Sequence, residues 1–92
     1  MVFKAVEVEK ALCKKGFAKR GGDHRFFTYQ TMDGRETTIQ TKISHSATDV
    51  DKYLISAMAK QCELSKVEFV DLIKCPLSRE RYESILKDKC VI

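Results

Sequence analysis

Two histidines are the residues best suited to acid–base chemistry in this chain of 92 residues. His24 follows a Gly-Gly-Asp turn, and His45 lies between two serines. An imidazole changes charge near neutral pH, so it can accept or release a proton during a reaction. Taken alone, a histidine at the start of a predicted hairpin strand is more often a surface residue. A loop histidine between serines is more often a local hydrogen-bonding group.

The four cysteines favour neither a metal site nor a disulfide. No Cys-x-x-Cys pair occurs, and no histidine stands at ligand spacing from any cysteine. Without an export signal, reduced thiols are the expected state. We therefore predict a protein without a metal ion and without a cofactor.

The positive charge of the chain lies in its N-terminal half. The formal net charge is +4. Residues 1–45 hold nine Lys or Arg against five Asp or Glu, whereas residues 46–92 hold eight of each. A basic half on a small domain suggests a polyanionic partner, with nucleic acid first. No apolar run approaches the ~20 residues that span a bilayer, and charges interrupt the first ten residues. We expect no membrane contact and a cytoplasmic location.

The first half predicts one helix and three strands. Apolar residues recur at helical spacing over 4–15, and Gly16 suits a left-handed helix end. Strands are predicted at 17–20, 24–31 and 35–43, the last two joined by an Asp-Gly turn. In 35–43 the odd positions from Thr37 to Ile43 share one side and the even positions from Glu36 to Lys42 share the other.

The second half predicts helices only. Residues 48–61 show a helical period, and Ser65 with Glu68 forms a capping box for a helix ending near Ile73. Pro76 stops that helix, and Ser78 can cap a last one at about 79–88. The aromatic residues of these helices, Tyr53, Phe69 and Tyr82, are expected to pack in the core or between helices. Lys60, Lys66 and Lys74 are expected to face solvent.

The expected fold is α+β, with the order α-β-β-β-α and one or two extra C-terminal helices. We predict a single domain over 1–92, with a core at 4–62 and a helical extension at 63–92. The three antiparallel strands carry helices on one face. Phe27 and Tyr29 are expected in the core with Ile39 and Ile43, while His24 and Phe26 face outward.

The ordered set of turns and helices resembles the HicA toxins of toxin–antitoxin systems over roughly residues 6–70. The resemblance rests on Gly16-Phe17 after the first helix, Gly22-Asp23-His24 opening the second strand, Asp33-Gly34-Arg35 before the third, and Tyr53-Leu54-Ile55-Ser56-Ala57-Met58 followed by Leu64-Ser65. It implies a fold similar to the double-stranded-RNA-binding domain. It also implies endonuclease activity on messenger RNA and a cognate HicB-type antitoxin that covers the site.

The catalytic histidine of that family corresponds to His24. Two departures stand beside it: Asp23 replaces the usual serine, and Arg25 replaces a frequent second histidine. A histidine near the place of His45 is also common in the family, and we expect His45 to contact RNA. The tail 75–92 exceeds the usual length and is a candidate for homodimer or antitoxin contacts.

On this resemblance, His24 would take a proton from a ribose 2′-hydroxyl, which then attacks the adjacent phosphorus. Phe26 could stack on a base or pack on a neighbouring segment, and Asp23 could favour the imidazolium or serve only the turn. Two other readings stay open: a non-catalytic RNA-binding module of the same fold, and a domain that binds only an inhibitor protein. The predicted RNA contacts are cations that could stabilise the charge on a phosphate and groups that could touch the RNA. They are Arg20, Arg25, Lys42, Phe26 and His45, and Lys19 is a weaker candidate.

Overall fold

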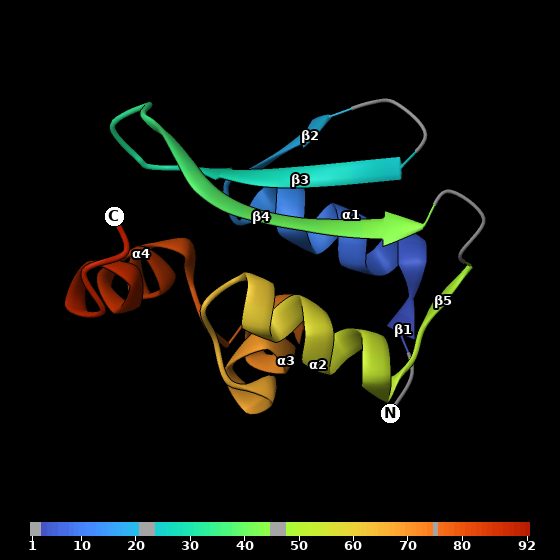
Figure 1. Ribbon diagram of the computed structural model, residues 1–92. Coiled ribbons are helices and arrows are strands. Elements are labelled where there is room, and N and C mark those ends of the chain that lie inside the picture. The colour runs from blue at the N-terminus through green and yellow to red at the C-terminus, as the bar shows by residue number, and fades with distance from the viewer. Residues whose placement is uncertain (1–2, 21–23, 45–47, 75) are drawn as a thin grey trace.

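The computed structural model describes residues 3–20, 24–44, 48–74 and 76–92. The chain begins with a short strand and the helix α1, Ala5–Lys14 (Figure 1). Val8 and Leu12, one helical turn apart, are fully buried on its inner side. Gly16 follows with φ +101°, the left-handed conformation predicted for the helix end.

Three antiparallel strands form the main sheet in the order β2-β3-β4. Their bounds are Phe17–Arg20 for β2, His24–Gln30 for β3 and Glu36–Ser44 for β4. Gly34, at φ +91°, forms part of the turn between β3 and β4. The predicted strands therefore match the observed ones to within one residue at each end.

A bulge interrupts β4 near its start. Thr28 pairs with Gln40, but Gln30 already pairs with Glu36, so β4 holds extra residues between these two pairs. The Thr37 hydroxyl donates to the Tyr29 carbonyl at 2.7 Å, and this bond replaces a backbone hydrogen bond that the bulge interrupts. Such a bulge disfavours the addition of a further strand to this edge of the sheet.

A second sheet of two short strands was not predicted. β1, Phe3–Lys4, pairs antiparallel with β5, Asp49–Val50. The helix predicted at 48–61 therefore starts too early, whereas the one predicted at 4–15 differs from α1 by one residue at each end. The later helix, α2, spans Lys52–Gln61, and the Asp51 carboxylate caps it by accepting from the Leu54 amide at 2.9 Å.

Two further helices complete the chain, α3 at Lys66–Lys74 and α4 at Arg79–Asp88. The predicted capping box is present, because Ser65 and Glu68 exchange hydrogen bonds of 2.9 and 3.2 Å. The Ser78 hydroxyl accepts from the Arg81 amide at 3.2 Å, as expected for its cap.

The helices lie on one face of the main sheet, and no helix of the described ranges covers its other face (Figure 1). Phe27, Tyr29, Ile39 and Ile43 are all buried beneath the sheet, as predicted. Tyr53 is 75% exposed, which corrects its expected packing role, since the face of α2 that carries it turns to solvent. Phe69 and Tyr82 are fully buried, and Lys60, Lys66 and Lys74 are exposed.

The helix α4 is bound to the sheet by polar contacts as well as by packing. Glu83, 4% exposed, accepts from the Tyr29 hydroxyl at 2.7 Å and from the Met32 amide at 2.8 Å. Arg79 donates to the Gln30 carbonyl at 3.0 Å. A Cβ at Gly16 would lie 2.5 Å from Arg79 Nε, so glycine there also makes room for α4.

The element order confirms the predicted α+β class. α1, β2, β3, β4 and α2 follow the α-β-β-β-α order of double-stranded-RNA-binding domains, and α3 and α4 are the extra helices. None of the helices in the described part of the chain combines the length and the apolar character that a bilayer-crossing segment needs.

Candidate nucleic-acid interface

Phe26 lies on the central strand of the main sheet, near the start of β3 and between two cations. In the strand register, Arg20 of β2 is its partner on one side and Lys42 of β4 is its partner on the other. Phe26 is half-buried, and both cations are exposed. The sheet thus brings together three of the residues predicted to contact RNA.

The two cations differ in their surroundings. Arg20 forms an ion pair with Glu36, whose carboxylate reaches it from β4, and both side chains are about half exposed. Lys42 has no acidic partner within ion-pair distance among the residues that the structure describes. Lys42 is therefore the cation on this face that is available to a phosphate without breaking an existing pair.

A polar hollow of about 230 Å³ adjoins Phe26 and Lys42. Its other walls are Gln40, Thr41 and Gln61 of α2, and the Thr41 hydroxyl donates to the Gln61 amide oxygen at 2.6 Å. An aromatic ring beside an ammonium group and amide side chains can stack on a base and hydrogen-bond to its edge. Gln61 was not among the residues expected at a site, and it borders this hollow because α2 brings it to Thr41 of β4.

His24 is the first residue of β3, and its backbone pairs with Ser44 at the end of β4. It stands two residues before Phe26, so it belongs to the same end of the same strand. His45 and Asp23, the other predicted residues of this region, lie outside the described part of the chain.

Arg25 is placed differently from the other predicted cations. It pairs in register with the buried Ile43, and its guanidinium forms an ion pair with Glu9 of α1. The side chains of Arg25 and Glu9 are only 18% and 12% exposed. Lys19 also reaches Glu9, at 3.0 Å. These two cations therefore lie on the helix side of the sheet, away from Phe26.

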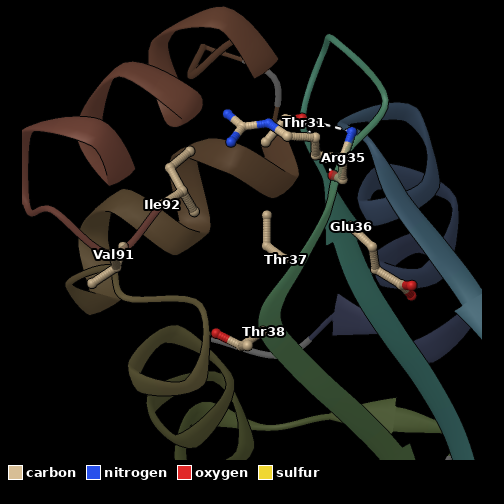
Figure 2. A pocket seen from close by; sticks show the side chains of 7 residues that line it. All are labelled: Thr31, Arg35, Glu36, Thr37, Thr38, Val91 and Ile92. Atoms are coloured by element: carbon tan, nitrogen blue, oxygen red, sulfur yellow. Dashed lines mark hydrogen bonds between the residues drawn. The ribbon is translucent and has the colours of Figure 1, made fainter.

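A second hollow, of about 240 Å³, lies at the other end of β4 (Figure 2). Thr37 and Thr38 point toward Val91 and Ile92, and the Arg35 guanidinium extends over the space between them. Glu36 points the opposite way, which is consistent with its ion pair to Arg20. The C-terminal residues thus border one end of β4 and leave the Phe26 end open.

Of the cysteines in the described ranges, one is buried and two are exposed. Burial raises the pKa of the Cys62 thiol to about 12, so this thiol stays protonated at neutral pH. Cys13 and Cys90 are exposed, and Cys75 lies outside the described residues. Within the described ranges, no three His, Cys, Asp or Glu side chains gather closely enough to hold a metal ion.

Comparison with known families identifies the chain's relatives. The model of the family described as "HicA toxin of bacterial toxin-antitoxin" matches residues 5–64. The match runs from the start of α1 to just beyond α2, so it includes the whole main sheet and excludes α3 and α4. No curated protein and no solved structure matches the chain.

Proposed function

The chain belongs to the HicA toxin family of bacterial toxin–antitoxin systems, and on that premise we propose that it is an endonuclease that cleaves messenger RNA with His24. The proposal includes neutralisation by a HicB-type antitoxin and a reaction that needs no metal ion. The family assigns the toxin role, and the cleavage chemistry is our inference from the residues of the uncovered sheet face.

The observation that carries the proposal is the triad of Arg20, Phe26 and Lys42 across three strands, two residues from His24. The alternation of the sequence predicts the same side for His24 and Phe26. A base stacked on Phe26 with its phosphate near Lys42 would bring the backbone of the RNA toward the start of β3, where His24 stands.

The proposed reaction is an internal transfer at phosphorus. The His24 imidazole takes the proton from a ribose 2′-hydroxyl, and the oxygen attacks the neighbouring phosphorus. The bond from phosphorus to the 5′-oxygen of the next nucleotide breaks, and that oxygen takes a proton from water. The products are a 2′,3′-cyclic phosphate and a free 5′-hydroxyl. Lys42 and Arg20 would stabilise the negative charge that builds on the phosphate oxygens. Because DNA lacks the 2′-hydroxyl, only RNA can react.

The experiment that tests this proposal is cleavage of messenger RNA by purified protein in EDTA, with His24→Ala as the comparison. We expect fragments that end in 2′,3′-cyclic phosphate from the wild type and none from His24→Ala. A substrate with 2′-deoxyribose at the cleaved position should resist both proteins. Equal cleavage by the two proteins would remove His24 from the mechanism.

A second candidate is a non-catalytic RNA-binding module of the same fold. The observation in its favour is that Asp23 and Arg25 flank His24 where the family usually has serine and a second histidine. This alternative predicts salt-sensitive RNA binding by both proteins with no new fragment ends. The cleavage assay therefore separates the two functions.

A further inference from the structure

A groove of about 420 Å³ lies on the outer side of α1, next to β2. Val6, Lys10 and Cys13 border it from α1, and Lys19 borders it from β2. Lys19 pairs in register with the buried Phe27, which places this groove on the helix side of the sheet and not on the face of Phe26.

The groove combines exposed apolar surface with positive charge. Val6 is 55% exposed, and the Cys13 thiol is also exposed. The carboxylate at its base, Glu9, is 12% exposed and already faces both Arg25 and Lys19. Lys10 has no acidic partner within ion-pair distance in the described ranges. The free charge that an incoming group meets here is therefore positive.

These features suit a protein segment better than RNA. An RNA site offers aromatic rings for bases and unpaired cations for phosphates. The five groove residues include no aromatic ring, and one of the two lysines is already 3.0 Å from Glu9. Aliphatic side chains can cover Val6 and Cys13, and a carboxylate beside them can pair with Lys10.

We propose that this α1–β2 groove binds an acidic, aliphatic segment of the antitoxin, as a contact additional to those by which the antitoxin would cover the RNA face. The proposal rests on the proposed function only in taking the antitoxin as the partner. It predicts that substitutions in the groove weaken antitoxin binding and leave RNA cleavage intact, because the groove and Phe26 lie on opposite sides of the sheet.

The chain offers matched variants for the test. Val6 and Val67 are both exposed and both stand second in their helices, where an aspartate is tolerated near the helix N-terminus. Lys10→Glu has its counterpart in Lys66→Glu, at another exposed helical lysine. The probe is the purified product of the reading frame adjacent to the toxin gene, and the measurement is its affinity by calorimetry.

We expect Val6→Asp and Lys10→Glu each to weaken this binding at least about tenfold, while Val67→Asp and Lys66→Glu leave it unchanged. Unchanged binding by the two groove variants, or equal loss in the controls, would overturn the proposal. So would weaker RNA binding by Val6→Asp at wild-type antitoxin affinity, or the splitting of a homodimer by that substitution. Absence of RNA cleavage by the wild type would instead contradict the proposed function, because the calorimetric result does not depend on cleavage.

Discussion

Arg25 of β3 forms an ion pair with Glu9 of α1 on the helix-covered side of the sheet, one residue after His24 in the chain. The pair is mostly buried, and Lys19 adds a second cation to the same carboxylate. It joins the start of β3 to the helix beneath it. Arg25 therefore serves to hold the strand that carries His24, and Lys42 is the better candidate for direct contact with phosphate.

Replacement of Arg25 should therefore cost stability more than RNA affinity. Arg25→Ala leaves the nearly buried Glu9 with a single cation, Lys19, and loss of a hydrogen bond between charged groups costs about 1.5–3 kcal/mol. We expect a fall of that size in the free energy of unfolding, measured by urea denaturation. Lys42→Ala, at an exposed position, should change it by less than about 0.5 kcal/mol. Equal stability of the two variants would contradict the anchoring role of Arg25.

The RNA affinity of Lys42→Ala should show the opposite pattern. Each phosphate contact that is lost reduces the dependence of log affinity on log salt by about 0.7 for single strands. We expect Lys42→Ala to lower that slope by about this amount in fluorescence anisotropy titrations at several salt concentrations. Lys74→Ala, at an exposed lysine of α3, should leave the slope unchanged. A Lys42→Ala slope equal to that of the wild type would exclude a phosphate contact there.

The strand positions could be predicted because alternation and turn residues act locally. The even positions from Glu36 to Lys42 are exposed, as expected from their pattern. The same rule, applied to Arg25, would have assigned it to the covered side, since it shares parity with Phe27 and Tyr29 in β3. Its inclusion among the RNA contacts came from charge alone.

Other features depend on contacts between distant parts of the chain, which no local pattern contains. β1 and β5 have two residues each and exist only through their pairing with each other. Glu83 looks like a solvated residue in a polar stretch, yet it is buried by the approach of α4 to Tyr29. The hollow beside Phe26 likewise needs Gln61 of α2 to close it.

Glu83 should make the stability of the fold depend on pH in the acid range. Burial raises the pKa of its carboxyl group. The hydrogen bonds from Tyr29 and Met32 and the charge of Lys87 together lower this pKa by more than burial raises it, so the net shift is downward from 4.5. The unfolded chain therefore binds the proton more readily than the folded protein. The ionised Glu83 contributes its full stabilisation above the ordinary pKa of the unfolded chain, and this stabilisation is lost as the pH falls through the pKa of the folded state.

The measurement is the free energy of unfolding from pH 7 to pH 3 for the wild type and for Glu83→Ala. At pH 7 the variant leaves the Tyr29 hydroxyl and the Met32 amide without their acceptor, which costs about 2 kcal/mol. The gap between the two proteins should narrow as the solution is acidified below about pH 4.5. A gap that widens with acid would mean that the carboxylate is not stabilised by these contacts.

Phe26 and Phe27 offer the sharpest separation of function from folding, because neighbouring residues of one strand point to opposite sides of the sheet. Phe27 is fully buried, and its replacement by alanine should cost about 4 kcal/mol of stability. Phe26→Ala should leave the chain folded and weaken RNA binding by about 1–3 kcal/mol if the ring stacks on a base. Thermal unfolding and RNA titration of both variants provide the two readouts. If Phe26→Ala binds RNA as the wild type does, no base stacks on the Phe26 ring, and the ring instead serves packing.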